Sequence, residues 1–248
     1  MEIICDTNIW YGLGNGFIDL GLIGKGNKLI ATFNNIDEFS RTTNILDKPD
    51  ETRNAIQSMF KHSGKHPIIE PPLFYLRKLS DENYSYEITV DDKAMLSITE
   101  KIAKGHQIEV SKSEEYRNYS ERRKANLQSV ADIFNTESRR IKPNVKDKKK
   151  HRKENSIELI RGMLSLFVDK QTGVGLYSDF DFRQIELLEN TIDYFFKELE
   201  TGATVMTAND WYDLFIMAYV SPGRKYWTGD KKWIRLIKEA GMEKYLFC

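Results

Sequence analysis

The stretch MEIICDTNIW (residues 1–10) places a short apolar run, Ile3-Ile4-Cys5, directly before a carboxylate, Asp6. A short apolar run without alternation is typical of a buried strand in a parallel sheet. In open α/β sheets, ligand sites lie at the carboxyl ends of the strands. Asp6 is therefore either a helix cap or the first side chain of a site, and this stretch alone leaves both interpretations open.

The composition indicates a soluble globular protein. Of the 248 residues, 40% are hydrophobic and 30% charged, and the formal net charge is zero, so the molecule as a whole does not attract nucleic acid. The two cysteines, Cys5 and Cys248, form no disulfide or zinc framework, which suits a cytoplasmic protein. We expect no signal peptide and no membrane partner, because the longest apolar run, 214–220, is too short to span a bilayer.

Hydrophobic periodicity predicts the α/β class, with strands near both ends of the chain and helices between them. An extended connection is expected at 67–76, where three of the six prolines lie. Residues 203–206 fit either a strand or a connection. Besides the first strand, the expected strands are 28–33, 225–228 and 245–248, and the expected helices are 36–46, 49–64, 91–105, about 111–141, 155–173, 182–202, 209–220 and 230–241.

Positive charge is concentrated in the middle of the chain. Residues 101–153 contain sixteen Lys or Arg and seven Asp or Glu, an excess of +9. The densest block is 142–154, which includes Lys148, Lys149, Lys150 and Arg152. A solvated loop between two helices explains such a block, and an arm that contacts phosphates is the functional alternative.

Acidic residues recur where strands meet helices. Asp210 and Asp213 are three residues apart on one expected helix, and Asp230 follows the expected strand 225–228. Glu38 follows the second expected strand. If the strands are parallel, these acids and Asp6 meet at one edge of the sheet. Carboxylates that converge repel one another unless a cation lies among them, and oxygen ligands favour Mg²⁺ or Mn²⁺.

Four segments in order, IICDTNIWY, NNIDEFSRT, NDWYDLFIMAYV and YWTGDKKW, resemble the four acidic motifs of the PIN-domain nucleases. The resemblance implies a three-layer fold, a mostly parallel sheet between helices, and metal-dependent cleavage of RNA, less often of DNA. It implies that Asn8 orients Asp6 by hydrogen bonding and that Thr228 supports Asp230 or a water. The implied metal-site acids are Asp6, Glu38, Asp213 and Asp230.

The resemblance covers about residues 1–46 and 203–248. We therefore expect a single PIN-like domain with a large helical insertion at about 47–202, whose role the family does not supply. Two choices stay open in the acid set. Asp37 adjoins Glu38, and Asp210 precedes Asp213 and is a second candidate metal ligand.

Simpler roles exist for most of these residues. Asp6, Asp210 and Asp230 each fit the sequence pattern of a helix cap. Lys231 and Lys232 follow Asp230 and could contact substrate phosphates at a helix N-terminus, or they are solvated residues of a first turn. Each acid taken singly is consistent with a cap, whereas four of them in the family's order favour a site.

The leading hypothesis is a cytoplasmic Mg²⁺- or Mn²⁺-dependent endonuclease that cuts single-stranded RNA in preference to DNA. A phosphatase of the haloacid-dehalogenase type would need an acid at position 8, which is Asn8. The other alternative is a non-catalytic PIN-like module that binds RNA or protein, in a toxin–antitoxin or defence system. The insertion could then dock a partner protein or antitoxin, and a homodimer is a further expected assembly.

Overall fold

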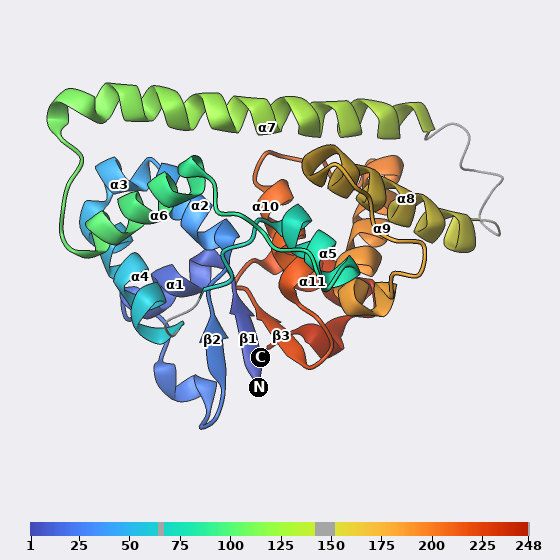
Figure 1. The fold of residues 1–248 in the computed structure, drawn as a ribbon, viewed down its shortest axis with the longest axis horizontal. Helices are drawn as coiled ribbons and strands as arrows, with labels where there is room; N and C mark the ends of the chain where they lie inside the picture. The colour runs from blue at the N-terminus through green and yellow to red at the C-terminus, as the bar shows by residue number, and fades with distance from the viewer. Residues whose placement is uncertain (64–66, 142–151, 248) are drawn as a thin grey trace.

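The computed structural model describes residues 1–63, 67–141 and 152–247. In these residues the strands β1 (Glu2–Cys5), β2 (Lys28–Ile30) and β3 (Arg224–Trp227) form one parallel sheet in the order β2-β1-β3 (Figure 1). The prediction of the α/β class is confirmed. All three strands come from the two ends of the chain, and their carboxyl ends meet at one edge.

The central strand β1 explains why the chain folds around its first residues. Ile3, Ile4 and Cys5 are completely buried. Ile4 packs in one hydrophobic core with Phe195 and Trp233, whereas Ile3 and Cys5 pack in a second core on the opposite face. Alternate side chains of a strand point to opposite faces, so an apolar run without alternation produces a strand that is covered on both sides.

Helices lie in two groups beside this sheet (Figure 1). The members of each group pack against one another. One group is α1 (Thr7–Gly14), α2 (Phe33–Arg41), α3 (Asn44–Asp47), α4 (Pro49–His62) and α6 (Val90–Ala103). The other is α5 (Pro72–Ser80), α8 (Arg152–Thr172), α9 (Glu186–Thr201), α10 (Asp210–Ile216) and α11 (Lys231–Glu239).

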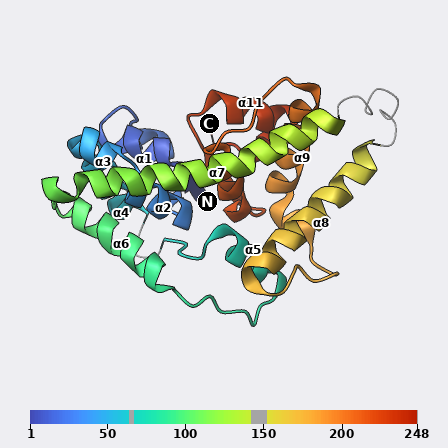
Figure 2. The same cartoon turned by 90° about the horizontal axis from the view of Figure 1, so that it is seen from above.

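The long helix α7 (Ser113–Ile141) crosses both groups (Figures 1 and 2). Near its start, the Tyr116 hydroxyl donates a hydrogen bond of 2.8 Å to the carbonyl oxygen of Ser40 in α2. Near its end, Asn135 is buried and exchanges two hydrogen bonds with the backbone of Met206, just before α10. These contacts fix α7 above the edge of the sheet where the strands end.

Several predicted boundaries need correction. The helix predicted at 36–46 is two helices, because Thr42 adopts extended backbone angles (φ −69°, ψ 133°) between α2 and α3. The strand predicted at 28–33 ends at Ile30. The extended connection predicted at 67–76 is wrong in its second half, since α5 begins at Pro72, a position where a helix tolerates proline.

The last predicted strand, 245–248, is also wrong for the residues that the structure describes. A 3₁₀ turn, η6 (Glu243–Tyr245), occupies its start, and Leu246 forms only an isolated bridge with Tyr226 of β3. Further 3₁₀ turns are Leu20–Ile23, Val110–Lys112, Phe182–Ile185 and Met217–Tyr219. Among the described helices, none combines the length and the apolar character that crossing a bilayer requires.

Candidate active site

Asp6 and Asp230 both lie between a strand and a helix, and both cap the helix. Asp6 follows β1 and accepts a hydrogen bond of 2.6 Å from the backbone N–H of Thr7, at the start of α1. Asp230 accepts from the backbone N–H groups of Lys232 (2.7 Å) and Trp233 (3.3 Å), at the start of α11. The cap interpretation is therefore confirmed for both, and capping also fixes the direction of each carboxylate.

A hydrogen-bond network joins these two acids. The Thr228 hydroxyl donates to Asp6 Oδ2 (2.7 Å) and accepts from the backbone N–H of Asp230 (3.0 Å). Asn8 Nδ2 donates to the same Oδ2 atom of Asp6 (2.6 Å), and Asn8 Oδ1 accepts from the backbone N–H of Gly229 (2.9 Å). Asn8 and Thr228, expected as supporting residues, thus both contact Asp6 and link it to the segment after β3.

The two other acids come from helices. Glu38 lies on α2 and Asp213 on α10, and the helices are tied by a hydrogen bond of 3.1 Å from Asn34 Nδ2 to the carbonyl oxygen of Tyr212. Both acids line the same pocket as Asp6 and Asp230, at the carboxyl ends of the strands. This pocket, called the carboxylate pocket below, has a volume of about 860 Å³. The expected site residues along it are Asp6, Asn8, Glu38, Asp210, Asp213, Asp230 and Lys232.

The structure separates Glu38 from its neighbour Asp37. Asp37 lies outside the lining of the carboxylate pocket. It is only 4% exposed and forms ion pairs with Arg41 (3.0 Å) and Arg123 (3.5 Å). The Arg41 guanidinium in turn lies over the Tyr212 ring, 4.0 Å from its centroid. Of the two adjacent acids, Glu38 is therefore the one that faces the other carboxylates.

Asp210 and Asp213 also differ, although both line the pocket. Asp210 Oδ1 pairs with the Lys232 ammonium at 2.5 Å, and Oδ2 accepts from the backbone N–H (2.7 Å) and the hydroxyl (2.9 Å) of Thr207. Its charge and both of its oxygens are thus already engaged. Lys232, for which the sequence left a phosphate contact and a solvated position open, forms an ion pair with Asp210. The stronger metal-ligand candidate on α10 is therefore Asp213.

The pocket raises the pKa values of Asp6, Glu38 and Asp213. Burial is the main cause for Glu38, with the nearby charge of Asp6 as the second, and together they raise its pKa to about 7. Burial and then Asp6 also raise the pKa of Asp213, to about 9. Burial raises the pKa of Asp6, against hydrogen bonds from Thr228, Thr7 and Asn8 that lower it. Acids that raise one another's pKa in this way need either protons or a cation among them.

The donor set fits Mg²⁺ or Mn²⁺ in its chemistry, because it consists of carboxylate oxygens. As they stand, no three carboxylate, histidine or cysteine side chains in the described ranges are close enough together to hold a metal ion. Mg²⁺ keeps several of its waters and binds through one or two carboxylates. Asp6, Asp213 and Asp230, with Glu38, are the residues that would hold the ion directly or through those waters.

The remaining expected contacts with nucleic acid are not brought to this pocket. Lys231 is exposed and does not line it. Lys148, Lys149 and Lys150 lie outside the described residues, and Arg152 is placed only as the first residue of α8.

Sequence reasoning missed the residues that α7 adds to the carboxylate pocket. They are Ser120, Glu121, Lys124 and Leu127. The polar sequence of α7 gives no sign of which helix or strand it covers. Arg41, another lining residue, had a local signal, since it lies four residues after Asp37 on one helix face.

Comparison of the chain with protein-family models, curated proteins and solved structures gives no significant match. The resemblance to the PIN-domain nucleases remains a prediction that depends on the four acidic segments.

Proposed function

We propose that this protein is a metal-dependent endonuclease that hydrolyses phosphodiester bonds, in single-stranded RNA in preference to DNA. One observation carries the proposal: four carboxylates from distant parts of the sequence, Asp6, Glu38, Asp213 and Asp230, line a single pocket at the carboxyl ends of parallel strands. That edge is where α/β sheets bind ligands. The order of the four acids, which resembles that of the PIN-domain nucleases, supports the same activity.

Each residue has a definable task in such a reaction. A divalent cation, when bound, would activate a water and stabilise negative charge at phosphorus. Asn8 and Thr228 hold Asp6 in one orientation through their hydrogen bonds. Glu38, with a pKa near 7, is suited to accept a proton from a water at neutral pH. Lys124, on the α7 side of the pocket, supplies a positive charge for a substrate phosphate.

The position of α7 favours a single strand as the substrate. This helix contributes one side of the carboxylate pocket, and a covered pocket accommodates one strand more readily than a duplex. Lys and Arg occur at three successive positions on this helix, 122–124. The preference for RNA over DNA depends on the resemblance alone.

One observation favours a second candidate, a binding module without catalysis. No three acids among the described residues are close enough together to hold a metal ion as they stand. A chain that binds nucleic acid through the same pocket, with protonated acids, would be consistent with that arrangement and with the raised pKa values of Glu38 and Asp213.

The test is cleavage of end-labelled single- and double-stranded RNA and DNA in EDTA, Mg²⁺ or Mn²⁺. The wild type is compared with Asp213→Asn and with a matched control, Asp179→Asn, which changes an exposed acid outside the carboxylate pocket. We expect metal-dependent cleavage by the wild type and the control only. Binding without cleavage by the folded wild type, under every condition, would support the second candidate instead.

A further inference from the structure

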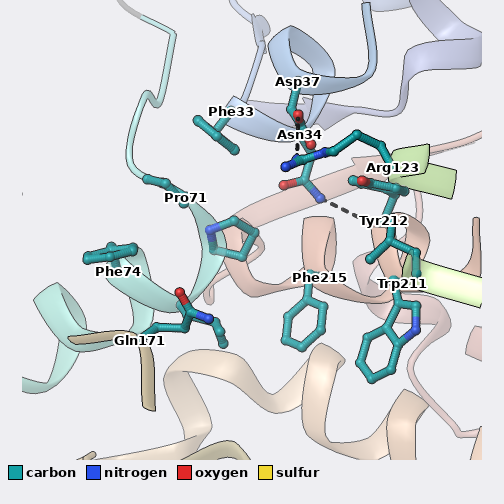
Figure 3. A pocket seen from close by; sticks show the side chains of 13 residues that line it. Phe33, Asn34, Asp37, Pro71, Phe74, Arg123, Gln171, Trp211, Tyr212 and Phe215 are labelled. Atoms are coloured by element: carbon teal, nitrogen blue, oxygen red, sulfur yellow. Dashed lines mark hydrogen bonds and ion pairs between the residues drawn. The ribbon is translucent and has the colours of Figure 1, made fainter. Parts of the chain in front are cut away.

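A second pocket adjoins the carboxylate pocket. It has a volume of about 320 Å³ and is lined mostly by apolar side chains (Figure 3). Leu127 of α7 and Tyr212 of α10 line both pockets, so the two share a wall. The volume is at the lower end of the range for small-molecule sites, roughly 300–1,000 Å³. We call it the aromatic pocket.

Aromatic rings form opposite sides of this pocket. Figure 3 shows Phe33 and Phe74 on one side and Trp211 and Phe215 on the other. The Trp211 and Phe215 rings are stacked, with an interplanar angle of 9° and centroids 5.6 Å apart. Phe134 packs edge-on against Trp211 and fixes its plane. Faces held in this way are suited to a flat ring, which stacks on them without requiring them to reorganise.

One end of the aromatic pocket is polar. Asn34, Asp37 and Arg123 gather there (Figure 3). Asp37 is 4% exposed, and its Oδ1 atom is buried and lacks a hydrogen bond from any described residue. Arg123 lies 3.5 Å from that atom, and Arg41 is bound to Oδ2. Arg123 balances the charge of this oxygen without a hydrogen bond, so the oxygen can still accept an N–H donor from a ligand.

These two features together select one type of occupant. An aliphatic or phenyl side chain of a partner protein would fill the apolar part but leave Asp37 Oδ1 without a donor, which is costly for a buried group. A nucleobase with an amino group offers both a flat face and an N–H donor on its edge. Adenine, cytosine and guanine have that amino group, whereas the one edge N–H of uracil lies between two carbonyl oxygens, which a carboxylate repels.

We propose that the aromatic pocket binds one amino-bearing nucleobase of the strand whose phosphodiester lies in the carboxylate pocket, and so sets the base preference beside the cleavage point. This inference depends on the proposed function for its substrate. Stacking between the two aromatic sides, Phe33 and Phe74 opposite Trp211 and Phe215, provides the affinity, and Asp37 distinguishes adenine, cytosine and guanine from uracil.

The test measures binding apart from cleavage. Fluorescein-labelled pentauridine RNA is compared, by anisotropy in EDTA, with strands in which one uridine is replaced by adenosine, cytidine, guanosine or an abasic unit. We expect one position at which an amino-bearing base binds about tenfold more tightly than uridine or the abasic unit. Equal affinity at every position would overturn the proposal.

Two variants connect that preference with the pocket. Phe33→Leu and Phe74→Leu keep an apolar side chain but remove a ring, and both should lose the preference while remaining folded. The matched control is Phe17→Leu, because Phe17 is 82% exposed and outside the aromatic pocket. A preference that survives in both folded variants, or that is lost equally in the control, would contradict the assignment to this pocket.

The outcome for the aromatic pocket can be distinguished from the outcome for the nuclease proposal. Metal-dependent cleavage without any base preference would overturn the aromatic pocket as a base site and leave the nuclease intact. A base preference that Phe33→Leu and Phe74→Leu abolish, with no cleavage in any metal, would support the base site and overturn the nuclease. A partner peptide that occupies the aromatic pocket, and that these RNA strands do not displace, would also overturn the base site.

Discussion

The carboxylate pocket has two walls that differ in how their acids are stabilised. The strand-end wall is Asp6 and Asp230, which cap helices and share a network of hydrogen bonds. The helix wall is Glu38 and Asp213, whose pKa values are raised to about 7 and about 9. The strand-end acids have a structural role whether or not the protein is an enzyme. The helix-wall acids lie within α2 and α10 and cap neither helix, so they are the stronger evidence for a function.

The difference between the two walls decides which of the four acids are evidence for a functional site. A carboxylate at the end of a strand is explained by capping alone, as Asp6 and Asp230 show. A buried acid with a strongly raised pKa in a pocket is costly for the fold, and such groups concentrate at functional sites. The predictions below therefore change one wall at a time.

The largest effect is expected for Glu38→Gln, which removes a proton acceptor from the helix wall. Loss of general-base catalysis lowers kcat by about 10²–10⁴-fold. The matched control is Glu121→Gln, since Glu121 lines the same pocket but is exposed on α7. It should stay within about threefold of the wild type, because an exposed charge is screened. Single-turnover cleavage rates distinguish the two variants. An equal loss of rate in both would show that Glu38 has no specific role in the reaction.

The helix wall should also make the metal-free protein less stable as the pH rises. Glu38 and Asp213 hold protons in the folded state above the pH at which the unfolded chain releases them. Unfolding then releases protons, so the free energy of unfolding falls by several kcal/mol between about pH 5 and pH 9.

Urea denaturation in EDTA across that pH range measures this slope. Asp213→Asn should flatten it and should be more stable than the wild type at pH 8, because the amide carries no charge to bury. A wild-type stability that is constant or increases with pH would contradict the raised pKa values of Glu38 and Asp213.

A change to the strand-end wall should have an intermediate effect. Asn8→Ala removes a hydrogen bond to Asp6 and one from Gly229, and loss of such a supporting contact costs about 10–100-fold in metal affinity or activity. Asn15→Ala is the matched control, because Asn15 bonds the Glu51 carbonyl oxygen at the other end of α1. Both variants should lose roughly 1 kcal/mol of stability, but only Asn8→Ala should lose Mn²⁺ affinity by titration calorimetry.

The smallest effect is expected outside both walls. Lys231→Ala removes an exposed charge that does not line the carboxylate pocket. RNA affinity should fall by less than about threefold at 0.15 M salt, because exposed charges are screened there. A much larger loss, measured by anisotropy, would place the substrate along the start of α11 rather than beneath α7.

The sequence predicted those parts of the fold that depend on local pattern. The run Ile3-Ile4-Cys5 predicted β1, because side chains buried on both faces must all be apolar. Hydrophobic spacing predicted α9, but it also merged α2 with α3, since the apolar period continues past the extended residue Thr42. The prediction of a strand at 245–248 was wrong because a 3₁₀ turn occupies its start, and Leu246 then pairs with β3 only through one isolated bridge.

The sequence predicted the acids of the site but not the residues that form ion pairs or contacts with them. Parallel strands bring their carboxyl ends together, so Asp6 and Asp230 were expected to be neighbours. Asp210 and Lys232 are 22 residues apart in sequence and lie on different helices, so no local pattern indicates their pairing. The position of α7 likewise depends on contacts such as Tyr116 with Ser40, which only the folded chain creates.

The most direct test of the central claim is anomalous diffraction from crystals of this protein soaked in Mn²⁺. We predict a manganese peak between the two walls, bound by Asp6 or Asp230 on one side and by Asp213 or Glu38 on the other, directly or through water. The peak should be lost in crystals of Asp213→Asn. A carboxylate pocket without manganese in well-ordered crystals, or manganese bound only at a distant surface, would contradict the account.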